Sequence, residues 1–144
     1  MRHTTVREIM TSCALCQLSS ATTVRDAICV MAERNCGCVL LNEAGRLAGI
    51  FTRGDALKRV VARALDPDRT RLADVMTRNP DTIAPQESVD DAIRRMDEFG
   101  YRHLPVLEGD KVVGVLSLRD CSIEDLAAMH RELEYRHVFA ERAW

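Results

Sequence analysis

Two stretches decide the fold of this 144-residue chain: Gly49-Ile-Phe-Thr-Arg-Gly-Asp55 and Gly114-Val-Leu-Ser-Leu-Arg-Asp120. Each has a glycine, an apolar pair, a hydroxyl residue and, three positions later, an aspartate. Glycine leaves space beside the backbone, and a hydroxyl residue followed by an acid is typical of a helix start. The two stretches therefore predict the same strand-to-helix turn at two places in one chain.

The similarity extends well beyond these turns. At an offset of 65 residues, Ser20–Asp55 aligns with Pro85–Asp120 without a gap, and nine of the 36 positions are identical. Upstream, Met10-Thr11 matches Met76-Thr77 at an offset of 66. Self-similarity at a fixed offset indicates an internal duplication.

Each copy predicts the elements strand, helix, strand, strand, helix. Thr23 and Ser88 precede apolar residues at helical spacing, and each has an aspartate three positions later, as expected at a helix start. Asn35 and Gly100 suit the left-handed turn that ends a helix. The expected strands are 16–18, 39–41 and 47–51 in the first copy and 82–84, 104–107 and 112–116 in the second, and further helices begin at Thr52 and Ser117.

The predicted fold class is α/β, with two such units packed as a pseudo-twofold pair, because a sheet of so few strands has little core of its own. The first repeat with its N-terminal segment is expected at 1–65, a polar linker at 66–71 and the second repeat at 72–122. Residues 123–144 are expected to form a helical extension with one apolar edge. That helix either packs against a partner chain or folds back on its own domain.

Composition excludes several classes of function. The chain is 47% hydrophobic and 29% charged with a net charge of −2, which gives no electrostatic reason to bind nucleic acid. No apolar run reaches the roughly 20 residues that span a bilayer, and the N-terminus lacks the apolar stretch of a signal peptide. We therefore expect a cytoplasmic protein with no nucleic-acid or membrane partner.

Catalysis has little support in the sequence. The four histidines show no paired metal spacing, and neither a Ser-His-Asp arrangement nor a Walker-type loop can be identified. The sequence thus predicts no enzyme, no catalytic residue, no metal site and no required cofactor.

Four strings together resemble the CBS domain family: the two opening stretches, Val75-Met-Thr77 and Tyr101-Arg-His-Leu-Pro-Val106. The resemblance covers residues 5 to about 122. The first repeat departs from it, with Leu40 at the usual proline and Gly54 at the usual arginine. The resemblance implies a Bateman module that binds an adenosine-containing ligand between paired domains (AMP, ADP or ATP foremost, with S-adenosylmethionine and NAD-type molecules as others). It also implies a homodimer.

By the same resemblance, Asp55 and Asp120 hold ribose, and Thr52 and Ser117 face ribose or phosphate. The chemistry agrees, because a carboxylate can accept hydrogen bonds from two neighbouring hydroxyls and a helix start attracts phosphate. Since Gly54 removes one positive charge, we expect the second site to hold phosphate better than the first. The other expected ligand contacts are Arg102, His103, Arg119, Leu18 and Ile83.

The same residues have simpler interpretations. Thr52-x-x-Asp55 and Ser117-x-x-Asp120 are also the pattern of a capping box, which Thr5-Val-Arg-Glu8 shares. His103 is equally well interpreted as a packed strand histidine.

Cys13-Ala-Leu-Cys16 is a C-x-x-C, which is typical of a redox pair or half a zinc site, but Cys36 and Cys38 do not have the spacing of a second zinc-ligand pair. The six cysteines are therefore expected to be mainly small buried hydrophobic residues. Three hypotheses remain. The chain is a nucleotide-sensing regulatory module, a redox- or stress-responsive scaffold that switches through Cys13 and Cys16, or an interaction protein that docks an unidentified partner through 123–144.

Overall fold

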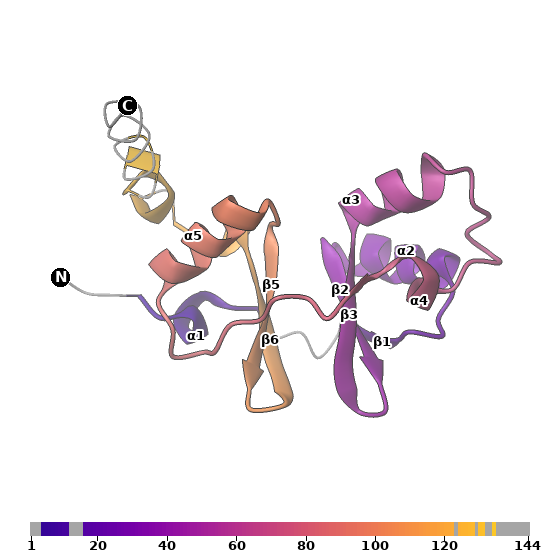
Figure 1. Cartoon of the computed structure of the whole chain (residues 1–144), viewed down its shortest axis with the longest axis horizontal. Coiled ribbons are helices and arrows are strands. Elements are labelled where there is room, and N and C mark those ends of the chain that lie inside the picture. The colour runs from indigo at the N-terminus through magenta and orange to yellow at the C-terminus, as the bar shows by residue number, and fades with distance from the viewer. Residues whose placement is uncertain (1–3, 12–15, 123, 129, 132–133, 135–144) are drawn as a thin grey trace, which may run out of the picture.

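A computed structural model of the chain describes residues 4–11, 16–122, 124–128, 130–131 and 134. Figure 1 shows two units side by side, with the strands between two outer sets of helices. Cys13 and most of the expected tail helix lie outside the described residues. Within the tail, residues 124–128 are helical.

The first repeat follows the predicted order of elements. Strand β1 (Gln17–Ser19) runs parallel to β2 (Cys38–Glu43), which pairs antiparallel with β3 (Arg46–Thr52). Helix α2 (Val24–Arg34) connects β1 to β2. The final helix begins as α3 (Arg53–Asp55) and continues as the π-helix η1 (Ala56–Val61).

The second repeat has α5 (Val89–Phe99), β5 (His103–Glu108), β6 (Lys111–Ser117) and the 3-10 turn η2 (Leu118–Asp120). Its opening strand is reduced to one parallel bridge from Ile83 to Val106. The helix expected from Ser117 stops after this single turn, because Cys121 is extended. Ser122 then accepts a hydrogen bond from the Asp125 N–H at 3.0 Å, which starts the next helix.

Local capping explains where α2 and α5 begin and end. The hydroxyls of Thr23 and Ser88 accept hydrogen bonds from the N–H groups three residues later, at 3.2 and 3.1 Å. Asn35 and Gly100 then end the helices with φ of 52° and 76°, in the left-handed region. These predicted boundaries are confirmed.

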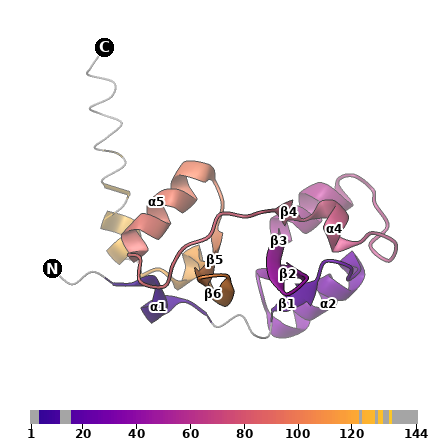
Figure 2. The same ribbon diagram turned by 60° about the horizontal axis from the view of Figure 1, so that its bottom comes forward.

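Each repeat is completed by the segment that precedes the other repeat. Helix α1 (Val6–Ile9) packs on the second repeat, where Val6 is fully buried, and Thr11 bridges Val115 of β6. Helix α4 (Leu72–Val75) and strand β4 (Thr77–Arg78) lie in the same way on the first repeat, where β4 pairs with β3. Figure 2 shows α1 beside the second repeat and α4 beside the first. Each of these two segments therefore precedes one repeat in the sequence and packs on the other.

Each repeat has its own hydrophobic core, and a third cluster joins them. Cys38, Leu40 and Ile50 are buried in this third cluster, and Val112 and Val115 of β6 pack against it. Leu40, which replaces the usual proline, thus lies between the two sheets. Among the described residues, no helix combines the length and apolar character needed to cross a membrane.

Candidate functional site

The two predicted turns have closely similar geometry. In the first, the Thr52 N–H donates to Asp55 Oδ2 at 2.9 Å, and the Asp55 N–H donates to Thr52 Oγ1 at 3.2 Å. In the second, the N–H and the hydroxyl of Ser117 both donate to Asp120 Oδ2, at 3.1 and 3.0 Å. Both pairs form capping boxes. The carboxylates are therefore held in place at the start of a helical turn, whatever else they bind.

The two aspartates differ in how many of their carboxylate oxygens have a partner within the chain. Asp55 Oδ2 accepts from Thr52, and its Oδ1 pairs with Arg59 Nε at 3.6 Å, one turn along the helix. At Asp120 every hydrogen bond from a described residue ends on Oδ2, including one from the Thr11 hydroxyl at 3.5 Å. Within the described part of the chain, Oδ1 of Asp120 therefore has no donor, and it can accept one from a ligand.

The motif glycines allow the Met-Thr segments to approach the turns. A Cβ on Gly114 would lie 2.8 Å from Met10 Sδ and 2.9 Å from the Thr11 carbonyl oxygen. A Cβ on Gly49 would meet Met76 Sδ at 2.5 Å and the Thr77 oxygen at 2.8 Å. The space that glycine leaves is thus filled by a neighbouring segment, and this places Thr11 beside Asp120.

His103 lies where the two repeats meet. Its Nε2 would be 2.9 Å from a Cβ on Gly37, so a larger residue at that position of the first repeat would require the imidazole to shift. Burial lowers the pKa of His103, Arg53 lowers it further, and Asp120 opposes this; Arg102 and Arg119 also lower it. Three arginines and Asp120 therefore act electrostatically on one half-buried imidazole.

Arg53 is the site residue that sequence reasoning missed. The offset of 65 aligns it with Leu118, and no pattern within one repeat indicates that it acts electrostatically on the second. The Leu118 N–H donates to the Arg102 carbonyl oxygen, and the Arg53 N–H donates to that of Gly37. These matching bonds hold both turns against the segments that carry Arg102 and Gly37.

The remaining expected contacts lie in different surroundings. Arg119 and Arg102 are exposed, next to the Asp120 turn and at the start of β5 respectively. Leu18 is half-buried on β1 and packs against the first core. Ile83 is only 2% exposed and belongs to the second core.

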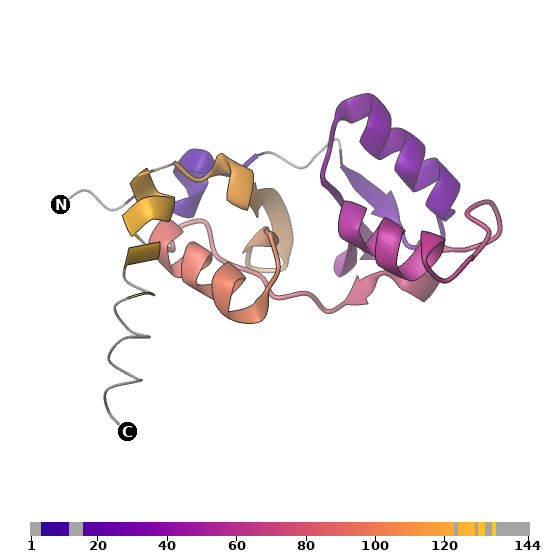
Figure 3. The same ribbon diagram turned by 90° about the horizontal axis from the view of Figure 1, so that it is seen from above.

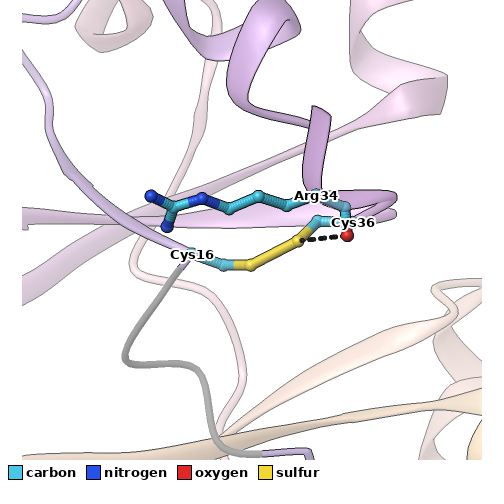
Figure 4. The surroundings of a disulfide bond; sticks show 3 residues. All are labelled: Cys16, Arg34 and Cys36. Atoms are coloured by element: carbon cyan, nitrogen blue, oxygen red, sulfur yellow. Dashed lines mark hydrogen bonds between the residues drawn. A yellow bond between two sulfur atoms is a disulfide. The ribbon is translucent and has the colours of Figure 1, made fainter. Parts of the chain in front are cut away.

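The cysteines depart from the sequence-based expectation. Cys38 and Cys121 are buried as expected, and burial with nearby Asp120 and Asp125 raises the pKa of Cys121 to about 11. Cys16, however, forms a disulfide with Cys36, and Cys29 is exposed. Figure 4 shows this disulfide beside Arg34, with Cys36 Sγ 3.7 Å from the Arg34 carbonyl oxygen. Sequence spacing suggested Cys13 as the partner of Cys16, whereas Cys36 is brought to it by the turn after α2.

Comparison with known protein families agrees with the two similar turns and with the packing of each preceding segment on the other repeat. The sequence profile of the CBS domain matches residues 6–62 and 72–125. The chain belongs to the CBS domain family. Its two repeats are therefore two CBS domains.

Known CBS proteins share both sequence and fold with this chain. The CBS domain-containing protein CBSCBSPB2 of Arabidopsis thaliana is 34% identical over 97% of this chain, which corresponds to 27% of that protein. This chain thus spans about a quarter of the length of such curated relatives.

Two solved structures show the same two-domain fold. A CBS-domain protein from Burkholderia ambifaria MC40-6 has a TM-score of 0.77 and 33% identity, covering 81% of this chain and 90% of that one. The protein PAE2072 from Pyrobaculum aerophilum, solved in complex with AMP, has a TM-score of 0.77 and 24% identity, covering 88% and 98%. The second likeness is one of fold.

Proposed function

We propose that this CBS pair is a non-catalytic regulatory module that binds AMP, ADP or ATP at the Asp120 turn. The observation that carries the proposal is that Oδ1 of Asp120 accepts no hydrogen bond from the described residues. The electrostatic effect of Arg53, Arg102 and Arg119 on the neighbouring His103 supports it. The carboxylate would accept the ribose hydroxyls. The hydroxyls of Thr11 and Ser117 donate to the same carboxylate and would lie next to the sugar.

The surrounding charges favour a ligand with phosphate over a neutral or cationic adenosyl ligand. Arginine is well suited to phosphate because its planar guanidinium can donate two parallel hydrogen bonds. In the first domain Gly54 replaces the arginine that Arg119 supplies in the second, and Arg59 occupies Asp55. We therefore infer that the Asp120 site fills first and that the Asp55 site, with Thr52, binds more weakly.

Regulation requires that the ligand bind two arrangements of the protein unequally. The site includes Arg53 from the first domain and Asp120 from the second, so occupancy would alter how the two domains meet. We infer that the protein is a cytoplasmic homodimer and that a partner protein binds differently to its two arrangements.

Thermal unfolding with a matched ligand series tests this function. AMP, ADP and ATP should each raise the midpoint, whereas adenosine and S-adenosylmethionine should raise it less, because at equal concentration the ligand that binds the folded state more tightly stabilises it more. Asp120→Asn should remove the shift, and Asp55→Asn should retain it. No shift with any phosphate-bearing ligand, for a protein that unfolds cooperatively, would exclude nucleotide sensing.

The Cys16–Cys36 disulfide favours a second function, a redox-responsive module. Cys16 ends the connection from the N-terminal segment, and Cys36 directly precedes Gly37, which contacts His103. A small disulfide such as glutathione disulfide would take two electrons and two protons from the two thiols as the bond forms, and would leave as two molecules of glutathione. Since disulfides are short-lived in a reducing cytosol, the bond would form under oxidising conditions.

Measuring AMP affinity at a series of glutathione redox ratios tests this alternative. A redox switch predicts an affinity that changes with the ratio in the wild type and stays constant in Cys16→Ser. Cys29→Ser is the matched control, because Cys29 is an exposed free thiol. An affinity independent of the redox ratio in the wild type would leave nucleotide sensing alone as the function.

A further inference from the structure

A pocket of about 400 Å³ lies between the β2–β3 hairpin of the first domain and the β5–β6 hairpin of the second. Proteins hold small molecules in pockets of roughly 300–1,000 Å³. The lining residues at the start of β3 and of β6 lie at the far end of these strands from the Asp55 and Asp120 turns. We call this the hairpin pocket. The lining residues that carry the argument are Gln17, Asn42, Leu47, Asp110, Lys111 and Val112.

The hairpin pocket is separate from the helices of both domains. In Figure 1 the tips of the two hairpins lie at the bottom, whereas α3 and α5 lie on the upper side. Figure 3 looks onto that upper side and shows the helices of both domains along it. A molecule in the hairpin pocket would therefore contact both domains and leave the helical side uncovered.

A β-bulge in each hairpin turns an apolar side chain toward the pocket. The register of β2 and β3 shifts after Leu41 and leaves Ala48 as the extra residue. Ala48 therefore packs on the first core and Leu47 on the third cluster, because a bulge changes the face on which the neighbouring side chains lie. The β5–β6 hairpin repeats this arrangement with Val113 and Val112. Leu47 and Val112 thus give the pocket an apolar wall.

Lys111 and Asp110 bring opposite charges to the same pocket. Lys111 stands opposite Glu108 in the register of β5 and β6, but Glu108 pairs with Arg7 at 3.2 Å. Within the described part of the chain, neither Lys111 nor Asp110 forms an ion pair or a side-chain hydrogen bond, and both are exposed. Each can therefore bind a ligand group of opposite charge without first breaking a bond to the protein.

An amide pair adds a polar wall. Asn42 Nδ2 donates to Gln17 Oε1 at 2.8 Å, and both residues are half-buried. No donor among the described residues bonds to Asn42 Oδ1, which can accept a hydrogen bond from a ligand. At the offset of 65 the second domain has Thr82 and Leu107 at these positions, so the amide pair belongs to the first domain alone.

We propose that the hairpin pocket binds a small apolar amino acid as a zwitterion. The Lys111 ammonium would pair with the α-carboxylate, and the Asp110 carboxylate would pair with the α-ammonium, which would also donate to Asn42 Oδ1. The aliphatic side chain would lie on Leu47 and Val112. A single exposed ion pair contributes little, so affinity depends on one ligand that meets both charges and buries apolar surface. This function goes beyond nucleotide binding and is independent of the Asp120 site.

A chemical-shift titration of the full chain with L-leucine tests the site, because it locates binding residue by residue. The backbone amide signals of Gly45 and of residues 110–112 should move, and those of the Asp120 turn should not. Leucine amide lacks the carboxylate, and 4-methylpentanoate lacks the ammonium. Each should bind about threefold to tenfold more weakly than leucine, as expected for the loss of one partly exposed charged contact.

Two variants and a matched control test the charged residues. Lys111→Gln and Asp110→Asn should each weaken leucine binding by a similar factor, about threefold to tenfold. Arg46 has the position of Lys111 in the first hairpin, is exposed and stands opposite Glu43, but it does not line the pocket. Arg46→Gln should therefore bind leucine as the wild type does. The spectrum of each variant shows at the same time that the chain is folded.

Three outcomes would overturn the proposal. The first is an absence of shifts at the hairpin pocket up to about 10 mM leucine, a concentration that saturates typical metabolite sites. The second is equal binding of leucine and its two analogues, because the site would then not recognise a zwitterion. The third is an equal loss in Arg46→Gln and Lys111→Gln, which would indicate a general effect of charge. AMP should bind Lys111→Gln with wild-type affinity, so a failure of nucleotide sensing is distinguishable from a failure of this site.

Discussion

At the scale of single residues, Gly114 links the fold to the site. A Cβ there would come within 3 Å of both Met10 Sδ and the Thr11 carbonyl oxygen, and one of these is backbone. Gly114→Ala should therefore push the Met10-Thr11 segment away from Asp120 and cost about 1–3 kcal/mol of unfolding free energy, as overpacking typically does. Chemical denaturation measures this directly. Gly54→Ala is the matched control, because its nearest neighbour would lie at 3.6 Å; that variant should be stabilised by about 0.5–1 kcal/mol in its helix.

His103 belongs to the same scale and predicts a pH dependence. Its pKa lies below the ordinary 6.5 in the free protein, so the imidazole is neutral at about pH 7. A phosphate dianion beside it would raise that pKa, so binding would take up a proton and AMP affinity would increase as pH falls from about 7.5 to about 6. Calorimetric titration across this range should show a weaker pH dependence in His103→Gln. Equal slopes in both proteins would place the phosphate away from His103, since titration of the AMP phosphate itself affects both alike.

At the scale of elements, the sequence could predict the features that depend on residues close together in the chain. Thr23 and Ser88 cap helices through bonds three residues away, and Asn35 and Gly100 end them, so these signals lie within a few residues of the element. The capping carboxylates Asp55 and Asp120 were predicted for the same reason. Arg53 beside His103 and the Cys16–Cys36 bond were missed, because both depend on how distant segments pack.

The exchanged N-terminal segment gives the element-scale prediction. Val6 of α1 is fully buried in the second core, although 77 residues of sequence separate it from Ile83 in the same cluster. Val6→Ala should cost about 2 kcal/mol, since it removes two buried methyl groups. Hydrogen exchange should then quicken in β5 and β6 more than in β2 and β3. Arg7→Ala, in the same helix but at an exposed ion pair with Glu108, should change stability by less than about 1 kcal/mol. Uniform quickening in both domains would contradict the exchange of segments.

At the scale of the whole molecule, two similar domains provide two unequal sites. Duplication gives each site the same glycine, hydroxyl and carboxylate, and the later differences at Gly54, Arg59 and Arg53 concentrate the available positive charge on one of them. We therefore propose that the chain combines a common scaffold with one preferred ligand site.

Calorimetric titration of AMP into the wild type, Asp120→Asn and Asp55→Asn tests the central claim most directly. We predict one preferred site per chain in the wild type and an affinity loss on the order of tenfold to a hundredfold in Asp120→Asn, as expected for a lost charged hydrogen bond. Asp55→Asn should keep the preferred site, because Arg59 already occupies that carboxylate. Equal losses in the two variants, or full affinity in a folded Asp120→Asn protein, would contradict the account and leave the Ser117–Asp120 turn as a helix cap alone.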